Sequence, residues 1–309
     1  MLANFLNKSK PINFISLSVF FAICFLATSI IDFFKVEFSF SILFNRIFVL
    51  LIFIIVFFIF NFIVSKNNLT FDNSYGFFLF SLLCICFAPL INSYKELILI
   101  IIYLLFIRKI YSLQSSKSMI KKLFDSGFWI GILCLFEPTY SLLFLLIYFS
   151  AYWYQKITIH TFLTPIIGFF TPIFSYFSYL FWIGKEAVFY EIFTPKTTFK
   201  FSFFSDENDL IFMVILLILT FFASISKSSK ALIINNTFKK SWSLLLVHLT
   251  IVFLLFLLQN DAKSTETIYL LFPISLVIAN GIELIRKNIF INIALYLFFI
   301  GCLFYSFYL

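Results

Sequence analysis

Residues 42–64 read ILFNRIFVLLIFIIVFFIFNFIV, a run in which Arg46 is the only charged side chain. The hydrocarbon core of a bilayer is about 30 Å thick, and a helix needs about 20 mostly apolar residues to cross it. This stretch meets that requirement with residues to spare. It therefore predicts a transmembrane helix.

The composition of the whole chain extends this prediction to all 309 residues. Hydrophobic residues make up 62% of the chain, charged residues 12%, and the mean hydropathy is +1.07. Soluble domains have about 45–50% apolar and about 25% charged residues. No polar stretch approaches the roughly 50 residues that a soluble domain needs. We expect a single integral membrane domain over 1–309, built as an all-α polytopic bundle.

Further apolar runs predict the other membrane spans. We expect about eleven in total, with the N-terminus in the cytoplasm and the C-terminus outside. Two of them, 96–110 and 123–136, are short for complete crossings. The predicted spans are 12–31, 42–64, 75–91, 96–110, 123–136, 138–155, 161–184, 209–226, 243–259, 267–285 and 289–308.

The charges sort by side when the spans are threaded in this order. Of the 22 Lys and Arg residues, 15 fall in predicted cytoplasmic segments, and 11 of the 14 Asp and Glu residues fall outside. Lys and Arg therefore obey the positive-inside rule, as expected in a bacterial inner membrane. The net charge of +8 lies in short loops that face anionic headgroups. We expect membrane lipids as partners and no nucleic acid.

Three hydrophilic stretches interrupt the apolar pattern. Residues 110–122 predict an amphipathic turn or helix on the cytoplasmic leaflet. Residues 185–209 form the largest external loop, and their aromatic side chains indicate an interfacial segment. Residues 227–240 predict a basic cytoplasmic loop.

The sequence shows no motif of a soluble enzyme. It has no glycine-rich phosphate loop, no nucleophile elbow and no HExxH. The five cysteines lie in apolar spans without a CxxC pair, and His160 and His248 have no nearby carboxylate, so no metal site is predicted. Glu283 precedes Arg286 by three residues, which predicts a local ion pair.

Four acidic residues fall on the predicted external face, at the ends of spans. They are Asp32, Glu37, Glu96 and Glu137. Catalysis or transport needs polar groups close to the membrane, so these are candidates. Each also has a structural explanation, because a carboxylate at a helix start complements the helix dipole and one just past a helix end is solvated.

The order of elements resembles a known enzyme architecture. CFAPLINSYKE (86–96) leads into the short apolar run LILIIIYLLFIRK (97–109) and a basic loop. DSGFWIGILCLFEP (125–138), SLLFLLIYFSAYW (141–153) and TIHTFLTPIIGFFTPIFSYFSYLF (158–181) follow. Over roughly residues 10–185 this order resembles the GT-C superfold of membrane glycosyltransferases, which use polyprenyl-phosphate sugars outside the membrane. Residues 186–309 would then add further spans. The chain as a whole resembles a family of flavobacterial-type inner-membrane proteins with a domain of unknown function.

The resemblance implies roles for six residues. In GT-C enzymes an acid in the first external loop acts as base or metal ligand, and the matching residues are Asp32 and, as second choice, Glu37. Basic residues near the outer surface hold the donor phosphate, a role open to Lys35, Arg46, Lys95 and Lys185. Polyprenyl phosphate would be the ligand, and a divalent metal the only cofactor an active enzyme could need. The first external loop is shorter than in most GT-C enzymes, so a degenerate relative remains an alternative.

Two other functions remain open, and with them the question whether the chain is an enzyme. One is a non-catalytic subunit of a cell-envelope assembly for secretion or motility, whose partners would be other membrane proteins. The other is a lipid or small-solute transporter. In that case the stretch 161–184, with Pro165 and Pro172, would be a broken helix at the binding site.

Overall fold

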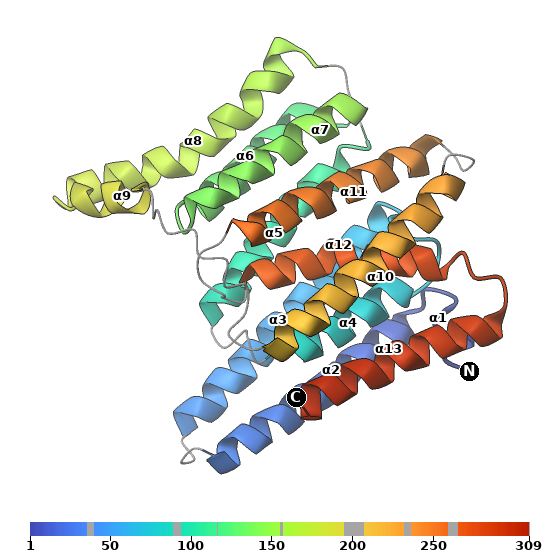
Figure 1. Ribbon diagram of the computed structural model, residues 1–309. Helices are drawn as coiled ribbons and strands as arrows, with labels where there is room; N and C mark the ends of the chain where they lie inside the picture. The colour runs from blue at the N-terminus through green and yellow to red at the C-terminus, as the bar shows by residue number, and fades with distance from the viewer. Residues whose placement is uncertain are drawn as a thin grey trace. The chain divides into compact units, whose positions relative to one another are not determined.

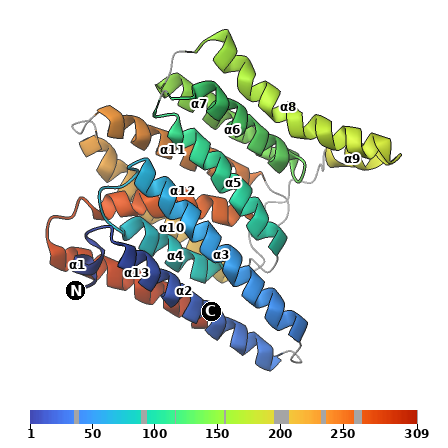
Figure 2. The ribbon, with the colours of Figure 1, turned by 180° about the vertical axis from the view of Figure 1, so that it is seen from behind.

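The structure is a computed structural model that describes residues 1–35, 40–88, 94–115, 117–154, 157–194, 207–231, 236–258 and 265–308. Within these ranges it contains thirteen α-helices and one 3-10 helix, and no strand (Figures 1 and 2). The all-α prediction is therefore confirmed. The contacts between backbone segments divide the chain into two compact units, and each unit takes residues from both 10–185 and 186–309.

Unit 1 comprises residues 1–100, 204–235 and 263–309. Its core is the helix α4, which packs against α2, α3, α12 and α13. The helix α12 in turn packs against α10, and the short α1 lies on α13. The helices of this unit are α1 (Leu2–Leu6), α2 (Pro11–Lys35), α3 (Phe40–Lys66), α4 (Tyr75–Phe87), the start of α5 (Tyr94–Ser112), α10 (Glu207–Ala231), α12 (Thr265–Ile282) and α13 (Asn288–Tyr308).

The helix α4 is apolar on every side, and all 13 of its residues are buried. An amphipathic helix would leave one polar face exposed, whereas a helix that is hydrophobic all round belongs inside a protein or a membrane. Aromatic rings fill the space around it. Phe80 of α4 stacks on Phe60 of α3 at 4.0 Å between ring centroids, and Phe60 meets Phe272 of α12 edge-on.

Unit 2 comprises residues 101–203 and 236–262. It holds most of α5, and α11 packs against α7 and the 3-10 helix η2. The short α9 contacts the end of α8. The remaining helices of this unit are α6 (Met119–Cys134), η2 (Pro138–Leu143), α7 (Phe144–Tyr154), α8 (Ile159–Trp182), α9 (Glu186–Ile192) and α11 (Asn236–Leu257).

The helices α6 and α8 run side by side in both views (Figures 1 and 2), and glycines let their backbones meet. A Cβ atom at Gly127 would lie 2.0 Å from the carbonyl oxygen of Pro165, and one at Gly131 would lie 2.4 Å from that of Phe169. Gly168 of α8 approaches Phe124 of α6 in the same way. Small residues at such a spacing allow close helix packing in membranes, where contact between backbones replaces the hydrophobic effect.

Six helices are long and apolar enough to cross a membrane, counting only the described residues. They are α2, α3, α8, α10, α11 and α13, and α4 and α12 are shorter apolar helices. A helix also forms at each of the other predicted spans, with η2 opening the one at 138–155. The chain thus has the makeup of a helical membrane protein. The short helices α1 and α9 were not predicted as separate elements.

Two local predictions differ from the structure, and a third is met in part. The segment 110–122, expected as a turn or a helix, has turns at 113–114 and 117–118, between the end of α5 at Ser112 and the start of α6 at Met119. The expected loop at 227–240 is largely helical, since α10 extends to Ala231 and α11 begins at Asn236. The stretch 161–184 is not broken, because α8 continues through Pro165 and Pro172.

Candidate functional site

Four of the six predicted site residues lie at one end of unit 1, called here the outer end because the predicted topology places these residues on the external face. Asp32 and Lys35 occupy the last turns of α2, and α2 packs against α3, the helix that follows it. Arg46 lies in the second turn of α3 and Lys95 in the first turn of α5. Glu37 lies outside the described residues.

A ring contact joins the starts of α3 and α5. The centroids of Phe48 and Tyr94 are 6.2 Å apart, and the rings meet edge-on. Arg46 is two residues from the first ring and Lys95 one residue from the second. The half-buried Arg46 and the exposed Lys95 therefore share this end of the unit.

One cation of the outer end, Lys95, lies in the first turn of a helix, where the helix dipole disfavours positive charge. A cation near a helix N-terminus costs roughly 0.3–1 kcal/mol, and the free backbone N–H groups there attract anions instead. Glu96 lies beside Lys95 in the first turn of α5, and Arg46 lies in the second turn of α3. The backbone N–H groups at the starts of these two helices would add to the attraction of both cations for an anion.

Lys185 belongs to unit 2, so it is described separately. It is exposed and occupies the position just before α9. Glu137 also lies in unit 2, before η2. The structure thus places Lys95 and Arg46 at the same end of unit 1, and it assigns Lys185 to the other unit.

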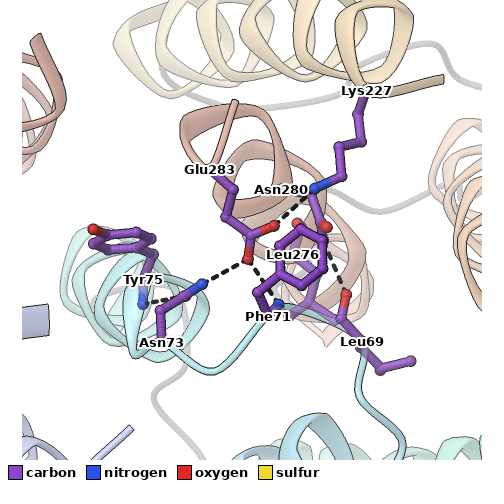
Figure 3. A network of polar contacts seen from close by, with 8 residues as sticks. All are labelled: Leu69, Phe71, Asn73, Tyr75, Lys227, Leu276, Asn280 and Glu283. Atoms are coloured by element: carbon purple, nitrogen blue, oxygen red, sulfur yellow. Dashed lines mark hydrogen bonds and ion pairs between the residues drawn. The ribbon is translucent and has the colours of Figure 1, made fainter. Parts of the chain in front are cut away.

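The most extensive polar network of unit 1 lies away from the predicted site residues, around Glu283 (Figure 3). Nζ of Lys227 is 2.8 Å from Oε2 of Glu283, and their side chains are 0% and 4% exposed. The other carboxylate oxygen accepts hydrogen bonds from the backbone N–H of Phe71 at 2.9 Å and from Nδ2 of Asn73 at 2.7 Å. The ring of Phe71 also covers the ammonium, with its centroid 4.5 Å from Nζ.

The network connects three elements of unit 1. Lys227 comes from α10, Glu283 follows α12, and Phe71 and Asn73 come from the segment between α3 and α4. Nδ2 of Asn280 donates to the carbonyl oxygen of Leu69 at 3.0 Å, which adds a second tie from α12 to that segment. Buried charges are tolerated only when they are paired and hydrogen-bonded, and this carboxylate has three donors.

The predicted ion pair between Glu283 and Arg286 is wrong. The spacing rule for such pairs holds on a helix, and α12 ends at Ile282. Glu283 instead reaches Lys227, while Arg286 is exposed. The one signal in the sequence was that Lys227 and Glu283 are each the first charge after an apolar run, on the same predicted side.

A second buried network lies in unit 2 around His248. Its Nδ1 is 3.0 Å from the hydroxyl oxygen of Tyr111, and its Nε2 hydrogen-bonds the hydroxyl of Tyr103. All three side chains are buried. One imidazole nitrogen donates and the other accepts, so the neutral ring satisfies two tyrosines of α5 at once. Sequence reasoning placed His248 in a span but missed both tyrosines, which are eight residues apart on one helix.

The groups of side chains that lie together decide which ligands the described residues could bind. Among the described residues, no group of three His, Cys, Asp or Glu side chains could hold a metal ion. The two buried networks tie helices together, whereas the outer end of unit 1 holds four of the six predicted site residues. We therefore take the outer end as the candidate site for ligand binding.

Comparison with known proteins adds a family. The model of a family described as "Family of unknown function (DUF6427)" matches residues 1–308. No curated protein and no solved structure matches the chain.

Proposed function

The chain belongs to the DUF6427 family, and because that family has no assigned function, we propose one from the charges at the outer end of unit 1. The protein binds the phosphate of a polyprenyl-linked sugar there. It acts as a GT-C-like glycosyltransferase at the external face of the bacterial inner membrane.

The contact between Phe48 and Tyr94 carries this proposal. It joins the starts of α3 and α5, and so gathers Arg46 and Lys95 at the end of the unit where α2 ends with Asp32 and Lys35. Arg and Lys are the residues that bind phosphate by charge-assisted hydrogen bonds. A polyprenyl chain would remain in the lipid while its phosphate meets these cations.

Asp32 is the residue proposed to act on the acceptor. As general base it takes the proton of the acceptor hydroxyl while the acceptor oxygen forms a bond to the anomeric carbon. The bond from that carbon to the phosphate oxygen breaks, and polyprenyl phosphate leaves with the electron pair. A divalent metal held by Asp32 would be the other way to stabilise the leaving phosphate.

Native mass spectrometry with added polyprenyl phosphate tests the binding step. Arg46→Gln and Lys95→Gln should each weaken binding, because a hydrogen bond to a charged group contributes about 1.5–3 kcal/mol. Lys66→Gln is the matched control, since Lys66 is an exposed lysine at the opposite end of α3. Equal affinity in all four proteins would refute the proposed site.

The catalytic step needs a separate variant. Asp32→Asn should keep the binding of polyprenyl phosphate and lose transfer of the sugar. If this variant transfers sugar at the wild-type rate, Asp32 is not the base. If no variant affects either measurement, the transferase proposal fails.

A second candidate is a non-catalytic subunit of an envelope assembly. The observation that favours it is that Lys227, Glu283 and His248, all buried, are engaged in contacts within their own unit. Such groups hold a scaffold in shape. Purification of the full chain in a fixed ratio with another membrane protein, together with an Asp32→Asn variant that remains functional, would favour this candidate.

A further inference from the structure

One end of unit 2 collects cations from three helices. The hydroxyl of Ser150, in α7, donates to the carbonyl oxygen of Ile110 at 3.3 Å, near the end of α5. The hydroxyls of Tyr154 and Ser241 are 3.0 Å apart and join the end of α7 to the start of α11. The end of α5 and the start of α11 therefore lie at the same end of the unit, beside the turn that leads into α6.

Two lysines at this end bind other groups of the protein. Nζ of Lys109 is 2.6 Å from Oδ2 of Asp125. Nζ of Lys122 donates to the carbonyl oxygens of Ser112 and Ser115 at 2.6 and 2.9 Å. These contacts pin the start of α6 to the end of α5. They leave the outer surface of the turn to other side chains.

Five further cations form what we call the basic platform. Four of the five are exposed, and Lys239 is half-buried. Among the described residues, neither Lys117 nor Lys121 has an ion-pair partner. The platform consists of Arg108, Lys117, Lys121, Lys239 and Lys240.

Apolar side chains stand among these cations. Ile120, next to Lys121, is 56% exposed, and Ile159 at the start of α8 is 77% exposed. The start of α8 belongs to the same end, because the hydroxyl of Tyr148 in α7 donates to the carbonyl oxygen of Phe162. Cations mixed with exposed apolar residues fit the boundary between headgroups and acyl chains.

We propose that the basic platform binds the headgroup of an anionic phospholipid, with the phosphate on Lys117 and Lys121 and the acyl chains against Ile120. The charge of the platform selects the lipid, since only Asp125 among the nearby described side chains is acidic and it is paired with Lys109. The inference concerns unit 2 and does not depend on the proposed transferase activity.

A photoactivatable phosphatidylglycerol tests the proposal. The full-length protein is placed in phosphatidylcholine nanodiscs that contain a small fraction of this lipid, and labelled peptides are mapped by mass spectrometry. Labelling of the peptide around residues 113–123 is expected. In Lys117→Gln/Lys121→Gln it should fall on the order of 25-fold, about fivefold for each lysine near a membrane surface. Lys117→Arg/Lys121→Arg should retain it.

The matched control removes two lysines from unit 1. Lys66 and Lys287 are both exposed, and Lys66→Gln/Lys287→Gln changes the net charge by the same amount. This control should label residues 113–123 as strongly as the wild type does. The proposal is overturned if a photoactivatable phosphatidylcholine labels the peptide equally, or if the control loses the label as well. Competition by inorganic phosphate or an acidic peptide at the concentration of the lipid would also overturn it.

Discussion

Nζ of Lys227 lies 2.8 Å from Oε2 of Glu283, although the two residues are 56 positions apart in the chain. Both side chains are almost fully removed from solvent, and Phe71 covers the ammonium. The pair fixes the end of α10 against the end of α12. The helix α10 is otherwise among the least covered of the long helices, with 17% of its residues buried.

Removing one partner of this pair should destabilise the protein strongly. Lys227→Met leaves the Glu283 carboxylate buried without its counter-ion, which costs about 3–5 kcal/mol in comparable sites. The double variant Lys227→Met/Glu283→Gln should lose less, because no uncompensated charge remains. Arg286→Met is the control and should change the stability by less than about 0.5 kcal/mol.

Thermal unfolding in detergent, followed by thiol labelling, measures these differences. All five cysteines are buried and free, so they react only as the protein opens. A large loss in Arg286→Met with none in Lys227→Met would show that the sequence-based pairing was right after all.

The glycines between α6 and α8 should not tolerate a side chain. In Gly127→Ala the new Cβ would lie 2.0 Å from the carbonyl oxygen of Pro165, so the helices must separate. Overpacking of this kind costs about 1–3 kcal/mol. Gly301→Ala in α13 is the matched control, since a Cβ there has no atom within 4 Å. It should be neutral or stabilise by about 0.5–1 kcal/mol. A neutral Gly127→Ala in the same thermal assay would argue against the close crossing.

A third prediction concerns the contribution of the hydrogen bonds of His248 to stability. Tyr103→Phe leaves one buried imidazole nitrogen without its hydroxyl partner, which should cost about 1–3 kcal/mol. His160→Phe removes an exposed histidine and should cost less than about 0.5 kcal/mol. Equal thermal midpoints for the two variants would mean that Tyr103 adds nothing to the stability of unit 2.

The contact between Ser9 and Asp72 should make stability depend on acid pH. Both the backbone N–H and the hydroxyl of Ser9 donate to Oδ1 of Asp72, and these hydrogen bonds lower the pKa of the carboxyl from 3.8. A lowered pKa in the folded state means that the contribution is fully present above about pH 4. It is lost as the pH falls through the lowered pKa. The thermal midpoints of wild type and Asp72→Asn should therefore differ by a constant amount above pH 4 and converge below it. A difference that grows on acidification would contradict this.

Much of the fold could be predicted from the sequence, because the length of each apolar run indicates whether it forms a helix within the membrane. The run 42–64 became α3 almost unchanged, and helices formed even at the short stretches 96–110 and 123–136. The boundaries at 110–122 and 227–240 were harder, because polar residues continue a helix as readily as they end it when its other side is packed.

The buried networks could not be predicted in this way. Local spacing assigned Glu283 to Arg286, whereas the fold brings Lys227 of another helix to it. The same limit applies to His248, whose partners Tyr103 and Tyr111 come from a helix far away in the sequence. Such pairs depend on which helices become neighbours, and hydropathy carries no information about that.

The helices that bury α4 are synthesised at different times. At about 1.5 Å per residue, its 13 residues extend about 20 Å, less than the hydrocarbon thickness. Its neighbours α2 and α3 are synthesised just before it, but α12 begins at Thr265 and α13 at Asn288, so both leave the ribosome much later than α4. During that interval α4 has no permanent partners on one side. Two helices that are synthesised long after α4 therefore complete the core around it, and a chain stopped before residue 265 would leave that core open.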